Sequence, residues 1–288
     1  MDINALQAFV EVARQGSFSK AADLLFVTQP AVSKRIASLE DELQARLFDR
    51  IGKNITLTET GEELLPRTRR LLLEADEMKR IASSISNSVS GRLTMGTSHH
   101  IGLHRLPPVL KAFHKQYPEV LMDLHFMDSE QACQAVEQGE LELAIVTLPS
   151  ATPTNLEVQT IWIDRLEVVT AADHPLAAQQ QAALKTLADY PAVLPGPQTY
   201  THQILQQELQ RLGLELDTTL STNYLETLKM LVITGLGWSL LPATMIDQSL
   251  HVLQTDLRLE RRLGSVIHRK RTLSNAVKAM LAIAHNRY

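Results

Sequence analysis

The chain has 288 residues, 44% of them hydrophobic, which is enough for two or three folded domains. Its formal net charge of −4 at pH 7 does not exclude a nucleic acid partner, because the location of charge matters more than the total. No apolar run is long enough to span a membrane, and a single cysteine, Cys133, excludes an intrachain disulfide. We expect Cys133 to be a small packed side chain in a helix.

The first fifteen residues, MDINALQAFVEVARQ, predict an amphipathic helix that carries acidic residues, which is unlike a signal peptide. Together with the single cysteine, this pattern favours a reducing, cytoplasmic compartment.

Residues 16–50 predict two short helices joined by a tight turn. Ser17 can cap the first helix by accepting a backbone hydrogen bond, and Thr28 can cap the second. Pro30 falls in the first turn of the second helix, where its missing N–H costs nothing. Apolar residues recur at helical spacing in both segments: Phe18, Ala21, Ala22 and Leu25, then Ala31, Ile36, Leu39 and Leu43.

Four polar residues near the start of the second helix are left facing outward: Gln29, Ser33, Lys34 and Arg35. Glutamine can pair with adenine, serine with a base or phosphate, and lysine or arginine with guanine or phosphate. A helix-turn-helix presents such residues to the major groove of DNA. On spacing alone, an ordinary helical hairpin with a solvated polar face is the alternative.

A small hairpin, or wing, is predicted after these helices. Leu47 and Phe48 are expected core anchors, residues 52–54 have turn chemistry, and residues 55–57 favour a strand. Arg50 and Lys53 would lie at the edge of the wing, where they can contact backbone phosphates or the minor groove.

A long helix is predicted from Thr58 to about Asn87, followed by a polar linker. Its apolar and small residues recur at steps of four and three, which is the seam of a coiled coil. We expect this seam to form a dimer; a lone amphipathic helix packed on a core is the alternative. The expected dimerisation residues are Leu64, Leu71, Ala75, Met78, Ala82 and Ile85.

From Arg92 onward strands alternate with helices, which predicts a parallel sheet with helices on its faces. The first set has strands over 92–96, 121–126 and 141–148 and helices over 104–118 and 129–139. The second has strands over 166–171, 190–196, 218–223, 238–242 and 263–270 and helices over 201–213, 224–237 and 273–287. Two similar lobes would enclose a crevice that binds a ligand at the carboxyl ends of strands.

At this point the sequence resembles a known family. The segment AFVEVARQGSFSKAADLLFVTQPAVSKRIASLEDELQARLFDR, followed by LTETG, is similar to the N-terminal domain of LysR-type transcriptional regulators. The segments GTSHHIGLHRLPPVLKAFHKQYPEV, ELELAIVTLP and ITGLGWSLLP resemble the effector-binding domain of that family.

The resemblance implies an α+β multidomain protein. Residues 1–58 would form a winged helix-turn-helix, 59–91 a dimerising linker helix and hinge, and 92–288 a two-lobed α/β effector-binding domain. This last domain would resemble type 2 periplasmic binding proteins, with lobe 1 at about 92–162 and 267–288 and lobe 2 at about 163–266. The expected protein is a nucleoid-associated regulator and not an enzyme. It would have no cofactor, bind a roughly palindromic site in double-stranded DNA, contact RNA polymerase, and form a dimer or a tetramer of two dimers.

The resemblance also assigns residues to two sites. Contacts to DNA would come from the recognition helix, the wing and the cap of the first helix: Ser17, Thr28, Gln29, Pro30, Ser33, Lys34, Arg35, Arg50 and Lys53. The effector would be held by loops after the strands: Thr97, Ser98, His99, His100, Asp128, Ser129, Thr147, Pro197, Thr199, Thr201, Asn223 and Glu226. Hydroxyls and helix N-terminal amides suit a carboxylate, so we expect a small carboxylate or an amino acid.

The histidines of SHHIGLH depart from the family pattern. His100 and His104 are four residues apart, which places both on one face of a helix. Metal binding needs more ligands than the sequence offers, so no metal site is expected; contact of His99 or His100 with the ligand and a solvated or capping role are the alternatives. Ligand contact would make effector binding depend on pH near neutrality.

Two other classes of function are disfavoured. For an enzyme, the sequence has no nucleophile elbow, phosphate-binding glycine loop or metal-ligand cluster, and helix capping explains Asp128 better than acid–base chemistry with Glu130 does. A solute receptor without DNA function would have no use for the helix-turn-helix.

Overall fold

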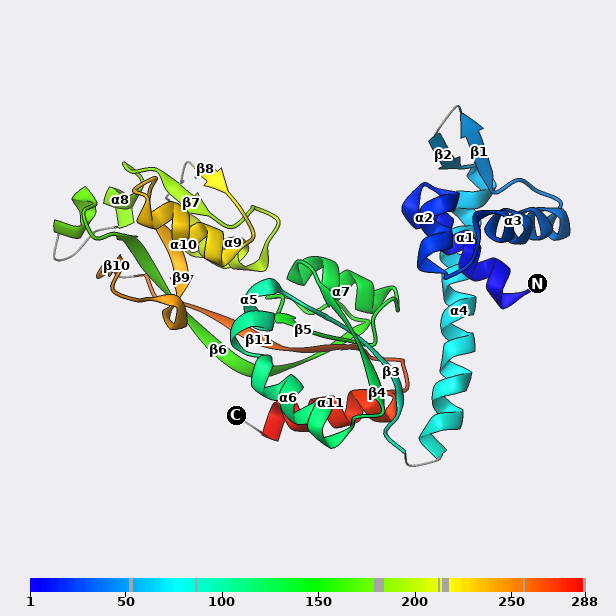
Figure 1. Ribbon diagram of the computed structural model, residues 1–288. Coiled ribbons are helices and arrows are strands. Elements are labelled where there is room, and N and C mark those ends of the chain that lie inside the picture. Colours follow the sequence, from blue (N-terminus) through cyan, green and yellow to red (C-terminus); the bar gives the residue numbers. More distant parts are fainter. Residues whose placement is uncertain are drawn as a thin grey trace. The chain divides into compact units, whose positions relative to one another are not determined.

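The computed structural model describes residues 1–51, 54–85, 88–178, 184–211, 213, 218–255 and 257–286. The chain divides into two compact units, Met1–Ser86 and Asn87–Tyr288 (Figure 1). Lys53 and Asn87, and the side chains of Arg50, Ala82 and Ile85, lie outside the described part.

The first unit contains the predicted helices and hairpin. They are α1 (Ile3–Gln15), α2 (Phe18–Leu24), α3 (Gln29–Leu43), β1 (Phe48–Ile51), β2 (Asn54–Leu57) and α4 (Glu59–Ile85). β1 and β2 pair antiparallel to form the wing. Its base is anchored in the core, because the ring of Phe48 packs edge-on against Phe9 and Phe18, with centroids 5.5 and 5.9 Å apart.

Caps and one strained turn position the two short helices. Ser17 Oγ accepts a hydrogen bond from Lys20 N at 3.3 Å, as predicted for the cap of α2. Thr28 occupies the N-cap position of α3, but its side chain makes no capping bond, so that detail of the prediction was wrong. Between the helices Phe26 has a left-handed backbone with φ of 53° and a side chain that is 95% exposed.

The long helix α4 starts where the sequence places it. Thr58 Oγ1 accepts a hydrogen bond from Gly61 N at 3.0 Å and donates one to Arg46 O at 2.7 Å. Gly61 allows the helix to lie against the base of the wing, since a Cβ there would be 2.3 Å from Leu47 O. Leu64 packs on the core of the first unit, whereas Leu71 and Met78 further along are exposed.

The second unit is a two-lobed α/β fold. Its first half contains β3 (Gly91–Thr97), α5 (His99–His104), α6 (Pro107–Gln116), β4 (Val120–Phe126), α7 (Ser129–Glu137), β5 (Leu143–Thr147) and β6 (Leu156–Ala171). Next come η1 (Pro175–Ala178), α8 (Leu184–Leu187), β7 (Ala192–Leu194), α9 (Tyr200–Arg211), β8 (Thr218–Ser221) and α10 (Leu225–Ile233). The chain ends with β9 (Ser239–Pro242), η2 (Ala243–Met245), β10 (Leu250–Val252), β11 (Leu259–His268) and α11 (Asn275–Asn286).

The main sheet is mixed rather than parallel throughout. Its order is β10-β6-β11-β5-β3-β4, with β9 also paired to β6. β3 runs parallel to β4 and β5, as predicted, but β5 with β11, β11 with β6, and β6 with β9 and β10 are antiparallel. The reason is that the chain leaves the first lobe along β6 and returns beside it along β11. β7 and β8 form a separate parallel pair.

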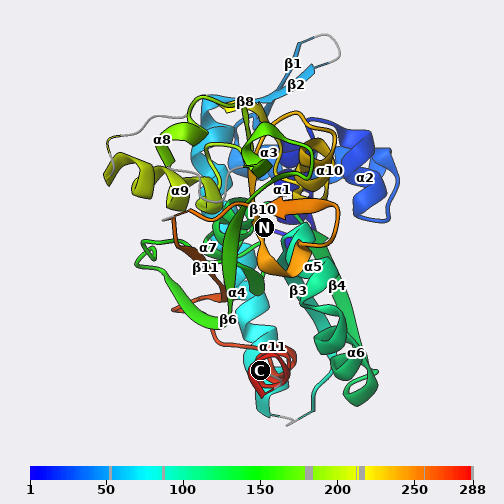
Figure 2. The same cartoon turned by 90° about the vertical axis from the view of Figure 1, so that its left-hand side faces the viewer.

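Lobe 1 is a sheet covered on both faces. Alternate residues of β5 point to opposite sides, so Leu143 and Ile145 pack with α6 and α11, while Ala144 and Val146 pack with α7. Helices α6 and α11 lie together on one face of this sheet and α7 on the other (Figure 1 and Figure 2).

Two long neighbouring strands connect the lobes. Along β6, Trp162 lies in a core of lobe 1 and Leu166 in a core of lobe 2; along β11, Leu259 lies in lobe 2 and Leu263 in lobe 1. The return crossing therefore comes before Leu263, a few residues earlier than the expected boundary near 266. At the adjacent irregularity, a Cβ on Gly264 would be 2.0 Å from Gln159 O, so glycine is required for the two strands to stay paired.

Candidate functional site

The start of α3 forms an exposed polar surface. Thr28, Gln29, Pro30 and Lys34 are exposed, and Ser33 and Arg35 are half-buried. The opposite side of the helix is fixed in the core by Val32, Ile36 and Leu39.

Three details qualify this surface. Gln29 Nε2 donates a hydrogen bond to Ser33 Oγ at 2.8 Å, so these two predicted base-contacting groups hold one another in place. Arg50 lies on the wing opposite Ile55, and its side chain and Lys53 are outside the described residues. The hydroxyl of Ser17 caps α2, which gives it a structural task besides any contact with DNA.

A polar cleft lies between the lobes of the second unit. It contains a cavity of about 50 Å³, with an adjoining depression of about 290 Å³ that shares Asp128 and Asn223 in its lining. The predicted effector residues that line the cavity are Ser98, His99, His100, Asp128, Ser129, Thr147, Thr199, Thr201 and Asn223.

The other predicted residues lie elsewhere. Thr97 is buried and donates a hydrogen bond to Ile145 O at 2.8 Å, so its hydroxyl supports the sheet. Pro197 is exposed, and Pro195 takes its place in the cavity wall. Glu226 faces the histidines of α5 instead.

Three lining residues escaped the sequence prediction: Glu130, Leu225 and Arg261. Arg261 was missed because the strand was predicted to begin at Leu263, whereas β11 begins at Leu259. The sequence does contain a signal for a longer strand with Arg261 on its buried face. Strand residues two apart face the same side, and Leu259, Arg261 and Leu263 are all buried.

A buried ion cluster lies behind the cavity. Arg261 donates to Asp164 Oδ2 through Nε at 3.3 Å and Nη2 at 3.0 Å, and to Thr201 Oγ1 through Nη1 at 3.3 Å. Arg105 Nη2 donates to Asp164 Oδ1 at 2.6 Å. Burial favours the neutral acid, but nearby His100 and the two guanidinium groups outweigh it and hold the pKa of Asp164 well below its usual range. One carboxylate thus balances two cations, which leaves the cluster with positive charge in excess.

Two carboxylates of lobe 1 reach across to lobe 2. Asp128 Oδ2 accepts a hydrogen bond from Asn223 Nδ2 at 2.6 Å. Glu130 accepts one from the backbone N–H of Tyr200, the first residue of α9, so its carboxylate lies at the positive end of that helix. Burial raises the pKa of Glu130 from its ordinary value.

Hydroxyl groups order the loops around the cavity. Thr199 Oγ1 donates to Gly196 O at 2.7 Å and accepts from His202 N at 3.2 Å, and Ser129 Oγ accepts from Thr147 N at 3.2 Å. These bonds fix the polar groups of the cleft before any ligand arrives, which lowers the entropic cost of binding.

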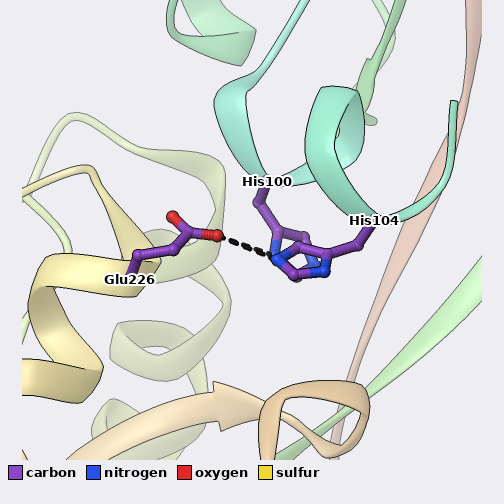
Figure 3. A group of neighbouring side chains, drawn as sticks. All are labelled: His100, His104 and Glu226. Carbon is purple, nitrogen blue, oxygen red and sulfur yellow. Dashed lines mark hydrogen bonds and ion pairs between the residues drawn. The ribbon is translucent and has the colours of Figure 1, made fainter. Parts of the chain in front are cut away.

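The histidines of α5 divide into two groups. The ring of His99 packs against Tyr224 and Phe126, with centroids 4.8 and 5.6 Å apart, at the cavity wall. His100 is buried and His104 exposed, and Glu226 of α10 faces both rings (Figure 3). Burial lowers the pKa of His100 below its ordinary value.

The fold and these two sites define a class of protein: a helix-turn-helix unit that binds DNA, followed by a two-lobed unit with a polar ligand cleft. A family model described as "Bacterial regulatory helix-turn-helix protein, lysR family" matches residues 3–62, and one described as "LysR substrate binding domain" matches residues 86–288. The chain belongs to the LysR family of transcriptional regulators, which is not a family of enzymes.

Curated relatives agree with this assignment. A probable nitrogen assimilation transcriptional activator of Synechococcus elongatus is 32% identical over 93% of this chain and 89% of its own. A probable RuBisCO transcriptional regulator of Trichormus variabilis is 30% identical over 87% of this chain and 76% of its own. An uncharacterized HTH-type transcriptional regulator of Azotobacter vinelandii is 57% identical over 38% of this chain and 75% of its own.

Solved structures show the same fold. A full-length OxyR variant from Pseudomonas aeruginosa has a TM-score of 0.73 at 22% identity, over 99% of this chain and 94% of that chain. Full-length CbnR in complex with its target DNA has a TM-score of 0.66 at 18% identity, over 100% and 99% of the two chains. The effector-binding domain of QuiR, solved with shikimate, has a TM-score of 0.62 at 18% identity and covers 69% of this chain and 97% of that chain. Within the described residues, no helix of this chain has the length and apolar character needed to cross a membrane.

Proposed function

We propose that this regulator senses a small carboxylate or an amino acid in the cleft between its lobes. The observation that carries the proposal is the buried ion cluster at the cavity wall, in which Asp164 balances only one of the charges of Arg105 and Arg261. A ligand carboxylate near Arg261 would restore the balance, because buried charge is stabilised when it is paired.

The lining of the cavity also carries negative charge. Asp128 and Glu130 supply this charge, and each accepts a hydrogen bond from lobe 2. An α-amino acid would match both signs of charge, with its carboxylate toward Arg261 and its ammonium group toward these two side chains. The effector-binding domain of QuiR, solved in complex with shikimate, gives a precedent for an organic acid on the same fold.

The test is a thermal-shift screen of the full chain against amino acids and small organic acids, followed by titration calorimetry of the hits. Each acid is paired with its primary amide, which keeps the shape and removes the charge. We expect acids to raise the melting temperature and bind saturably, while their amides bind at least about tenfold more weakly. Saturable binding of uncharged or cationic compounds alone would contradict the proposal.

On the DNA side, we propose that α3 reads a roughly palindromic site as one half of a symmetric pair. The paired copies would meet along the exposed part of α4, with the dimer or a tetramer of two dimers as the working form on the nucleoid and RNA polymerase as its partner. An effector entering the cleft would change how far apart two half-sites are held. We therefore expect an effector to alter the footprint or bend of the bound DNA without dissociating the oligomer; dissociation into monomers would count against this coupling.

A further inference from the structure

Two histidines of lobe 1 and one carboxylate of lobe 2 converge beside the cavity, which His100 also lines. His100 and His104 lie one turn apart on α5, and Glu226 lies near the start of α10 (Figure 3). One ligand-type atom from each residue falls within 4.8 Å of the other two. His104 Nε2 is 3.0 Å and His100 Nδ1 is 3.9 Å from Glu226 Oε1.

These separations are close to those of a tetrahedral metal site. With zinc–ligand bonds of about 2.0–2.1 Å, neighbouring ligand atoms stand roughly 3.4 Å apart. All separations are within 4.8 Å, so the widest would have to shorten by at most about 1.4 Å for the three side chains to hold one ion. The donor set, two imidazoles and one carboxylate, is one that zinc uses when a fourth position is left for water.

The surroundings of His100 supply a second observation. Its side chain is 5% exposed, and neither ring nitrogen has a hydrogen-bond partner among the residues that the structure describes. Nε2 is 3.6 Å from Asp164 Oδ2, which is beyond hydrogen-bond distance. A buried nitrogen without a partner costs free energy. A metal ion bound to Nδ1, which faces Glu226, would remove that cost.

We propose that His100, His104 and Glu226 form a site for one transition-metal ion, of which zinc is the best match. Two ligands come from lobe 1 and one from lobe 2, so the ion would hold the two lobes together at the cleft. The site does not depend on the chemical class of the effector, and it can be tested without one.

The test uses the full-length chain, freed of any affinity tag and treated with a chelator. Co²⁺ is added as a coloured probe, because tetrahedral cobalt absorbs visible light far more strongly than octahedral cobalt. We expect one equivalent of Co²⁺ to give the intense tetrahedral spectrum and Zn²⁺ to displace it, since nitrogen and oxygen sites bind zinc more tightly than cobalt.

Three variants locate the site. His104→Gln and Glu226→Gln change residues that are about 40% exposed, so the fold is expected to tolerate them. Each is expected to weaken Zn²⁺ binding at least about tenfold. His114→Gln alters an exposed histidine of α6 and is expected to leave the affinity unchanged.

A second readout separates an ion that joins the lobes from one bound at the surface. In the wild type, Zn²⁺ is expected to slow amide hydrogen exchange in both α5 and α10, and in His104→Gln it is expected to slow neither. Equal Zn²⁺ affinity in all four proteins, a weak octahedral Co²⁺ spectrum, or protection confined to one helix would overturn the proposal and leave the contact between His104 and Glu226 as an ordinary ion pair.

Discussion

The guanidinium group of Arg261 donates two hydrogen bonds to one oxygen of Asp164, at 3.3 and 3.0 Å. Both side chains are at least 95% buried, and they are almost a hundred residues apart in the chain. Because β6 and β11 cross between the lobes side by side, this ion pair lies where both lobes meet the cleft.

Loss of the carboxylate is expected to destabilise the chain. Asp164→Asn would leave Arg261 and Arg105 buried or half-buried without a counter-charge, and we expect the free energy of unfolding in urea to fall by about 3–5 kcal/mol. Asp123→Asn is the matched control, because Asp123 pairs with the exposed Arg92; its effect is expected to be under about 1 kcal/mol. Equal losses in the two variants would contradict the role of the buried cluster.

The carboxyl group of Glu130 is expected to make the stability of the folded chain depend on pH. Because its pKa is raised in the folded chain, the wild type binds this proton more tightly when folded, and stability is lost as pH rises through the folded pKa. Glu130→Gln keeps an acceptor for the N–H of Tyr200 and removes this titration. The stability of the variant relative to wild type is therefore expected to increase between about pH 4 and pH 7 in urea unfolding. A constant or falling difference would show that burial does not penalise this carboxylate.

The start of α3 is expected to divide into base-reading and phosphate-binding residues. Gln29→Ala is expected to cost about 1–3 kcal/mol on the cognate site and to relax specificity at one base pair. Lys34→Ala is expected to weaken binding to all DNA sequences alike. It is also expected to lower the slope of log affinity against log salt concentration by about one. Fluorescence anisotropy on matched and altered duplexes measures both, with Gln116→Ala in the second unit as a control. A uniform loss on every sequence for Gln29→Ala would contradict base reading.

The exposed part of the seam on α4 is expected to mediate self-association. Leu71 and Met78 are 47% and 73% exposed in the single chain, although both are large and apolar. Leu71→Glu and Met78→Glu are expected to shift the protein toward monomers in analytical ultracentrifugation, since each would bury a charge in the seam. Arg70→Glu, on a neighbouring exposed face, is expected to change the assembly little. A stable dimer in all three variants would place the interface elsewhere.

Cys133 is expected to be inert as a nucleophile. Burial raises the pKa of its thiol to about 11. At about pH 8 only ~0.1% of it would be thiolate, which is the reactive form. Ellman's reagent is therefore expected to react at least about a hundredfold more slowly with the native chain than with the chain unfolded in guanidinium chloride. Comparable rates would show that the thiol is accessible and ionised.

The sequence predicted the first unit almost completely. Period-3.6 patterns, a serine cap and a proline after Thr28 are local signals, and they place α2, α3 and α4 within a residue or two. The same kind of signal failed at 99–118, where one helix was expected from His104. Two helices, α5 and α6, are present instead, and Pro107 is the first residue of the second, where its missing N–H costs no helical bond.

The cleft was predicted from its loops but not from its strands. Hydroxyl-rich loops such as 97–100 are local features and were found. Arg261 was not found, because its importance depends on a pairing with Asp164 that no local pattern encodes. The convergence of Glu226 on His100 and His104 is likewise a property of the tertiary fold: the residues lie more than 120 positions apart.

The pairing of β6 with β11, which Gly264 permits, determines how the two lobes can move. β6 and β11 are hydrogen-bonded to each other from Leu156 to Leu166, so the connection between the lobes is a paired ribbon and not two independent threads. Such a ribbon resists sliding, because sliding would break the whole ladder of bonds at once, but it bends and twists at low cost. The lobes would therefore close by bending of this two-stranded connection. Its stiffness would set how far a bound ligand can draw the lobes together.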